Sequence, residues 1–132
     1  MEFKLKGFPT DLWANIFRIG NGEGPDHQVK GSRYPSLFLN KNRFFTFTIT
    51  LGDNPNNYKD YGENLLESNT YHIIIEQKMI DGKWMYQFSV NGIMIDSIEN
   101  TKAMVLDEAK LYLSDPWTTT ADVEFTYFRI EY

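Results

Sequence analysis

The sequence predicts an all-β domain built as an antiparallel two-sheet β-sandwich, and three observations carry this prediction. The dipeptides Asp81-Gly82 and Asn91-Gly92 divide the stretch from Tyr71 to Asn100 into three runs of strand-forming residues. Such dipeptides are typical of two-residue hairpin turns, because both positions adopt positive φ angles. Aromatic residues make up 16% of the chain, and aromatic side chains favour pleated, half-buried strands. No segment keeps a helical period over the ~10 residues that a helix requires.

The first half of the chain contains four predicted strands. In the last of them the apolar residues alternate almost perfectly, so Phe45 and Phe47 face one side and the intervening threonines face the other. Two polar stretches, residues 20–34 and 52–69, are predicted as loops, the first because it is rich in Gly. The four predicted strands are Glu2–Gly7, Leu12–Ile19, Pro35–Asn40 and Arg43–Leu51.

The second half contains the three strands of the Tyr71–Asn100 meander, then Lys110–Leu113 and Val123–Tyr132. In the last run the apolar alternation shifts by one residue after Tyr127, which predicts a β-bulge. Nine or ten short strands at regular spacing are typical of a sandwich or a barrel. Because no linker or repeat divides the sequence, we expect residues 1–132 to form a single domain.

Composition excludes several classes of function. The net charge is −5 and the sequence pI is near 5.0, which argues against a nucleic-acid partner. No segment approaches the ~20 apolar residues that cross a bilayer, so membrane insertion is not expected. The chain has no cysteine, which excludes disulfides and cysteine-ligated zinc. Met1 leads directly into a predicted strand, so we expect a cytosolic protein or one module of a longer secreted chain.

The order of the strand motifs carries a resemblance to a known superfamily. EFKLKGF precedes WANIFRIGNG and GSRYPSLFLN, and then come TYHIIIEQ, YQFSVNGIMIDSIEN, AKLYLSDPW and FRIEY. In this order, over nearly the whole chain, the sequence resembles the concanavalin A-like lectin and glucanase jelly-roll superfamily, nearest to laminin-G-like modules. The resemblance implies ligand sites on the concave sheet or in loops at one rim. It also implies a glycan or extracellular protein as partner, often with calcium, and a location outside the cell or at its surface.

The chain lacks one lectin signature and one enzymatic signature of that superfamily. The galectin pattern His-x-Asn-x-Arg has no match, since His27 and His72 both lie in other contexts. The Glu-x-Asp-x-x-Glu carboxylates of the glucanases are also missing. Because hydrolysis of a glycosidic bond requires two positioned carboxylates, we expect no enzymatic activity.

Two side chains near strand ends are candidate ligand contacts. Trp117 follows Ser114-Asp115-Pro116, and an exposed indole beside a carboxylate can stack on the apolar face of a sugar ring. The alternative is a Trp packed over the end of the sandwich, with Asp115 bonding the backbone of its own turn. Arg33 can present a two-pronged donor to a carboxylate such as that of a sialic acid, or it pairs with an acid of the protein itself.

The predicted second loop supplies three more candidate ligand contacts, Asn57, Tyr58 and Tyr61. Amides bond sugar hydroxyls and aromatic rings stack on sugar rings, so this mixture fits glycan binding. The same composition is equally that of any solvated loop, although the length of this one is unusual.

Four aspartates in or beside loops are candidate calcium ligands: Asp26, Asp53, Asp115 and Asp122. Calcium prefers oxygen donors and takes six to eight of them, some from backbone carbonyls. Asp is also a common turn residue for local reasons, and no clustered Asp-x-Asp-x-Asp run is present.

These observations favour a non-enzymatic recognition module that binds a glycan or an extracellular protein through loop and concave-face residues. The first alternative is a structural or adhesion sandwich that acts by protein–protein association. A second alternative is an intracellular β-barrel carrier of a hydrophobic ligand, whose length matches this chain. A hydrolase with the same fold is disfavoured by the missing carboxylate pair.

Overall fold

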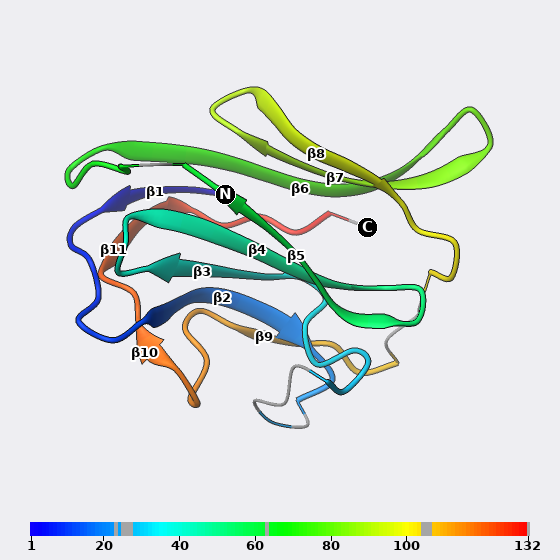
Figure 1. Ribbon diagram of the computed structural model, residues 1–132, viewed down its shortest axis with the longest axis horizontal. Helices are drawn as coiled ribbons and strands as arrows, with labels where there is room; N and C mark the ends of the chain where they lie inside the picture. Colours follow the sequence, from blue (N-terminus) through cyan, green and yellow to red (C-terminus); the bar gives the residue numbers. More distant parts are fainter. Residues whose placement is uncertain (23, 25–27, 63, 104–106, 132) are drawn as a thin grey trace.

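The computed structural model describes residues 1–22, 24, 28–62, 64–103 and 107–131. The chain forms two β-sheets stacked face to face (Figure 1). Neither sheet closes on itself, which confirms the predicted all-β, two-sheet sandwich. Among the described residues, no helix has the length and apolar character needed to cross a membrane.

The first sheet has five strands in the order β11-β1-β6-β7-β8. Asp81 (φ 50°) and Gly82 (φ 78°) form the turn that joins Thr70–Ile80 to Lys83–Val90. Asn91 (φ 51°) and Gly92 (φ 79°) form the turn that joins Lys83–Val90 to Ile93–Glu99. Two successive positive φ values match the turn whose twist suits a hairpin, so both predicted turns are confirmed. The strands are β1 (Glu2–Leu5), β6 (Thr70–Ile80), β7 (Lys83–Val90), β8 (Ile93–Glu99) and β11 (Val123–Tyr127).

The second sheet has six strands, with the order β10-β2-β3-β4-β5 and with β9 also pairing with β2. The central strands form an antiparallel meander, whereas the two residues of β10 pair with β2 in parallel. The strands are β2 (Trp13–Gly20), β3 (Ser36–Asn40), β4 (Phe44–Leu51), β5 (Asn54–Tyr61), β9 (Lys110–Tyr112) and β10 (Thr119–Thr120).

Two sequence predictions about the secondary structure need correction. The stretch from Gly52 to Asn69 was expected to be a loop, but Asn54–Tyr61 is strand β5 at the edge of the six-stranded sheet. Its Asn, Pro, Lys and Asp residues disfavour strands by themselves, and pairing with β4 overrides that preference. The bulge was expected after Tyr127, but the β1–β11 register shifts earlier, opposite Thr126. Strand β11 then ends at Tyr127 instead of continuing along the chain.

Aromatic side chains from both sheets meet in the core. The rings of Phe47 and Phe88 stack with centroids 5.1 Å apart, and Phe45 meets Tyr71 edge-on at 5.1 Å and Phe3 at 5.8 Å. All five side chains are buried. The two sheets stay open around this packed aromatic core, so the fold is not the closed barrel that the carrier alternative assumes.

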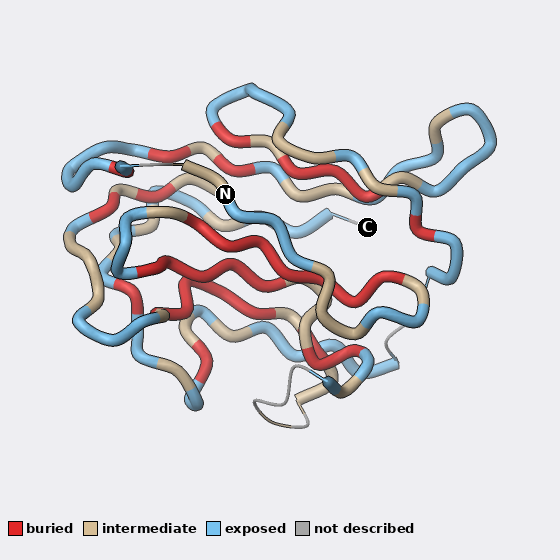
Figure 2. The backbone as a smooth tube through the Cα atoms, in the orientation of Figure 1, coloured by how far each residue is buried: buried red, intermediate tan, exposed pale blue. Residues whose placement is uncertain are grey.

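Strand β4 is buried on both faces. Its apolar residues face the five-stranded sheet, while Thr46 and Thr48 on the opposite face are only 6% and 3% exposed. Figure 2 shows that β2, β3 and β4 are buried along most of their length. Neighbouring side chains on the outer face of the six-stranded sheet therefore cover these threonines. The groove described below lies on this face.

We expect Phe47→Ala to lower the free energy of unfolding by about 3–5 kcal/mol, because the fully buried ring is lost from the stack on Phe88. Chemical denaturation followed by circular dichroism measures this loss. Tyr58→Ala is the matched control, since that ring is 63% exposed and its removal should cost about 0.5 kcal/mol or less. Equal losses in the two variants would contradict the role of Phe47 in joining the sheets.

Candidate functional site

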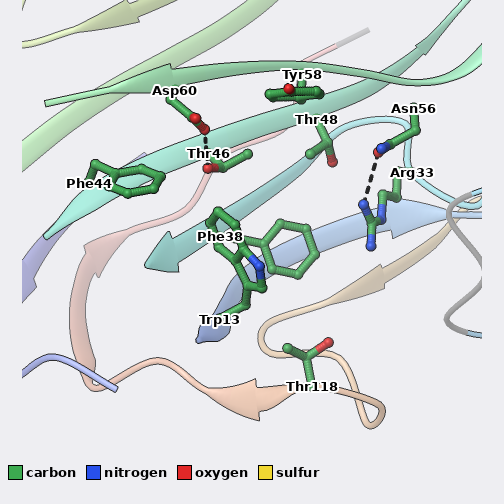
Figure 3. A pocket seen from close by; sticks show the side chains of 10 residues that line it. All are labelled: Trp13, Arg33, Phe38, Phe44, Thr46, Thr48, Asn56, Tyr58, Asp60 and Thr118. Carbon is green, nitrogen blue, oxygen red and sulfur yellow. Dashed lines mark hydrogen bonds between the residues drawn. The ribbon is translucent and has the colours of Figure 1, made fainter. Parts of the chain in front are cut away.

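The outer face of the six-stranded sheet carries a groove with a volume of about 520 Å³, within the usual range of ligand pockets. Figure 3 shows its lining side chains, which come from four neighbouring strands and two connecting segments. These residues are Trp13, Arg33, Phe38, Phe44, Thr46, Thr48, Asn56, Tyr58, Asp60 and Thr118.

Cross-strand register places the groove residues in rows. Phe38 lies opposite Thr46, which lies opposite Asp60. Ser36, Thr48 and Tyr58 form the next row, and Trp13, Asn40 and Phe44 form the row on the other side. Because alternate residues of a strand point to opposite faces, the register that packs Phe45 and Phe47 into the core also places these rows outward.

Aromatic rings supply most of the apolar lining. Trp13 and Phe44 meet edge-on with centroids 5.7 Å apart, and both are partly exposed. Phe38 is 5% exposed and lies beneath the guanidinium of Arg33, 4.9 Å from its ring centroid. Tyr58 stands on β5 with most of its ring in solvent. These rings offer flat apolar faces at several depths along the groove.

Two pairs of polar groups lie among the aromatic rings (Figure 3). The Thr46 hydroxyl donates a hydrogen bond to the Asp60 carboxylate. In the second pair, Arg33 Nη1 donates to Asn56 Oδ1 at 2.9 Å. Asn56 and Asp60 are four residues apart on β5, which corresponds to ~13 Å along the strand. The Asp60 carboxylate and the Arg33 guanidinium therefore lie in different parts of the groove, and the row of Trp13 and Phe44 lies beyond Asp60.

Two buried hydroxyls in the row next to Arg33 have no hydrogen-bond partner among the described residues. They belong to Ser36, which is fully buried, and Thr48, which is 3% exposed and lines the groove. A buried polar group without a partner typically costs about 1–3 kcal/mol. The sheet therefore keeps unmet hydrogen-bonding capacity below this end of the groove.

The structure brings together only two of the five side chains predicted to contact a ligand, Arg33 and Tyr58. Asn57 pairs with Ile49 and so belongs to the opposite face of β5. Tyr61 packs partly against the core and borders a separate, smaller hollow beside Phe44. Trp117 lies outside the lining of the groove.

Most of the groove residues were not predicted from the sequence. The alternation in β4 correctly placed the threonines on the face opposite to Phe45 and Phe47, but no role was predicted for them. Trp13, Phe38 and Phe44 were not among the predicted ligand contacts. The one available signal was the nearly continuous apolar run in β2 and β3, which indicates strands buried on both faces.

Trp117 takes part in a buried polar cluster at the edge of the six-stranded sheet. Its backbone N–H donates to Asp115 Oδ1 at 3.1 Å, as the turn alternative predicted. Arg18 Nη1 donates to Asp115 Oδ2 at 3.2 Å, and the guanidinium lies 5.2 Å from the Trp117 ring centroid. Burial lowers the pKa of Arg18, while the charge of Asp115 opposes this shift. The indole is still 38% exposed, so part of one surface faces solvent.

The candidate calcium ligands are not gathered. Asp115 is engaged with Arg18, and Asp53 forms ion pairs with Lys30 (2.7 Å) and Lys102. Among the described residues, no three His, Cys, Asp or Glu side chains lie close enough to hold a metal ion, so Asp53, Asp115 and Asp122 do not form such a group. Asp26 lies outside the described residues.

Comparison of the chain with protein-family models, curated proteins and solved structures found no match. The resemblance to concanavalin A-like proteins therefore stays a prediction from the sequence.

We expect Asp115→Ala to lower the free energy of unfolding by about 3–5 kcal/mol, because it leaves the Arg18 charge buried without its partner. Thermal and chemical denaturation measure this loss. Replacing both partners by apolar residues, Arg18→Met with Asp115→Leu, should recover much of the stability. Asp122→Ala, an exposed control, should change it by no more than about 0.5 kcal/mol. A single variant as stable as the control would contradict this account of the pair.

We expect the Asp53 carboxyl to titrate with a pKa of about 2, because hydrogen bonds and charge from Lys102 and Lys30 stabilise its ionised form. A folded-state pKa below the ordinary 3.8 means that these pairs stabilise the fold above that pH, and that their contribution is lost as the pH falls toward 2. Carboxyl carbon NMR measures the titration. Lys102→Ala should raise the pKa, whereas Lys59→Ala should not. An unchanged pKa in Lys102→Ala would refute the assignment.

Proposed function

We propose that this domain is a non-enzymatic recognition module that binds a glycan in the groove of the six-stranded sheet. The observation that carries the proposal is the lining of the groove, where partly exposed aromatic rings alternate with hydroxyl, amide and carboxylate groups. The resemblance of the strand order to lectin-like modules supports the same class of ligand and a location outside the cell.

The chemistry of a sugar matches this lining in two ways. The C–H hydrogens on one face of a sugar ring are apolar and weakly electropositive. This face therefore stacks on the electron-rich faces of Trp13, Phe44 or Tyr58. Sugar hydroxyls both donate and accept hydrogen bonds. A carboxylate has four acceptor positions and Thr46 uses one at Asp60, so the same group can accept hydroxyl hydrogens from a ligand.

The charges of the groove support recognition instead of hydrolysis. Among the described residues that line the groove, Asp60 is the one carboxylate. Glycosidases use two carboxyl groups on either side of the scissile bond, one as an acid and one as a base or nucleophile. We therefore assign binding and no bond cleavage to the groove.

Association with a protein is the second candidate function, because apolar side chains lie on the outer face of the other sheet. Ile74, Ser89 and Met94 form one cross-strand row, with Ile74 and Met94 42% and 49% exposed. Light scattering over a concentration series tests self-association, and Ile74→Lys should abolish any oligomer formed through this row. An oligomer that persists in Ile74→Lys would contradict association through this row.

We expect the domain to bind members of a glycan array, and Tyr58→Ala to weaken the binding about tenfold, because the exposed ring loses its stacking contact. Tyr127→Ala is the matched control, since that ring is 44% exposed on the other sheet. Running the array with calcium and with a chelator tests whether a metal takes part. A blank array in both buffers, or equal binding by both tyrosine variants, would overturn the groove as a glycan site.

A further inference from the structure

Asp60 is a carboxylate without a counter-ion in the groove. Its side chain accepts a hydrogen bond from the Thr46 hydroxyl, and among the described residues no Lys or Arg forms an ion pair with it. Asp53 and Asp115, by contrast, are both paired with Lys or Arg. The Asp60 carboxylate keeps acceptor positions besides the one that Thr46 uses, and the residue is exposed to solvent. It therefore presents a negative charge that a bound cation can neutralise.

Aromatic rings lie close to this carboxylate. Tyr58 is two residues away on the same face of β5, ~7 Å along the strand, and is 63% exposed. Phe44 and Asp60 together line both the groove and the smaller hollow beside it, so they are neighbours where the two hollows meet. The face of an aromatic ring attracts a cation as well as apolar C–H groups. A carboxylate beside such rings therefore favours a ligand that carries a positive charge on an apolar ring.

The positive charge of Arg33 lies in a different part of the groove. Arg33 Nη1 donates to Asn56 Oδ1, and Asn56 is ~13 Å from Asp60 along β5. Figure 3 shows the guanidinium turned toward Asn56 and away from Asp60. Charges in solvent are largely screened beyond ~8 Å at physiological ionic strength. A cation at Asp60 would therefore meet little repulsion from Arg33, and the net charge of −5 would attract it toward the protein.

We propose that the groove binds an amino sugar, with the free ammonium group on the Asp60 carboxylate and the C–H face of the same sugar on the Tyr58 ring. This inference rests on the proposed glycan-binding function and adds the class of glycan. The ammonium group donates to the carboxylate at the acceptor positions that Thr46 leaves open, and a charge-assisted hydrogen bond of this kind is stronger than one between neutral groups. An acetamido or hydroxyl group in the same place is neutral, so it lacks this added strength. Asp60 is then the residue that determines specificity.

The test is a glycan array that prints amino sugars beside their N-acetylated and hydroxyl counterparts, followed by solution titration of the strongest matched set. Oligomers of glucosamine, N-acetylglucosamine and glucose with the same linkage form one such set, because they differ in one substituent of each ring. The wild type should bind the glucosamine oligomer about tenfold more tightly than either neutral oligomer. Equal binding of the three oligomers would contradict the amino-sugar proposal.

Asp60→Asn separates the charge of Asp60 from the shape of the groove. The amide oxygen still accepts the hydrogen bond from Thr46, so denaturation should show the stability of the wild type. This variant should bind the glucosamine and N-acetylglucosamine oligomers equally, because the ammonium group loses its counter-ion. Glu124→Gln is the matched control, since it changes the net charge equally but lies on the five-stranded sheet, and it should retain the preference. A preference that persists in Asp60→Asn, or one that is lost in both variants, would overturn Asp60 as the site of the amine.

Ionic strength gives a second measurement that needs no variant. Raising it from about 0.01 M to about 1 M shortens the Debye length from ~30 Å to ~3 Å. Because Asp60 is exposed, the preference of the wild type for the glucosamine oligomer should fall with added salt, whereas binding of the neutral oligomers should change little. A preference that salt leaves unchanged would contradict an ionic contact at Asp60. Equal binding of charged and neutral oligomers, weakened by Tyr58→Ala, would overturn the amino sugar but keep the glycan groove, whereas a blank array would overturn both proposals.

Discussion

The register of strand β4 is the constraint on which the rest of the structure depends. Phe45 and Phe47 pack against rings from β1, β6 and β7, and this packing fixes how the two sheets face each other. The residues between them, Thr46 and Thr48, necessarily point outward into the groove. A slip of one residue would place threonines in the core and rings in the groove. The same strand therefore supplies core side chains on one face and groove side chains on the other.

A buried polar cluster holds the edge of the same sheet. Arg18 Nε donates to the Ser32 carbonyl at 2.8 Å, and the buried Asn15 side chain accepts from the Asp115 backbone N–H at 2.8 Å. The contacts of Asp115 with Asn15 and Arg18 fasten the turn between β9 and β10 onto β2, and the contact with Ser32 holds the segment before β3. Buried ion pairs add little net stability in general, because desolvation offsets their attraction. Here the cluster instead fixes the position of the segment that carries Thr118, which lines the groove.

Local sequence patterns predicted some elements well and others poorly. The hairpins at Asp81-Gly82 and Asn91-Gly92 were predictable because the turn residues themselves require the observed φ angles. Strand β5 was not, because Asn54, Pro55 and Lys59 carry no strand preference and become a strand only by pairing with β4. For the same reason Asn57 and Tyr61 were expected in a loop, whereas their strand positions direct them away from the groove.

The sequence by itself determined the all-β class, the hairpin turns and which residues of β4 enter the core, since alternation and turn chemistry act over neighbouring residues. Only the tertiary structure decided the groove. Trp13 and Thr118 line the same hollow although more than a hundred positions separate them. Their meeting depends on cross-strand register and on the parallel pairing of β10 with β2. These relations arise between distant segments when the sheets pack, so no local pattern records them.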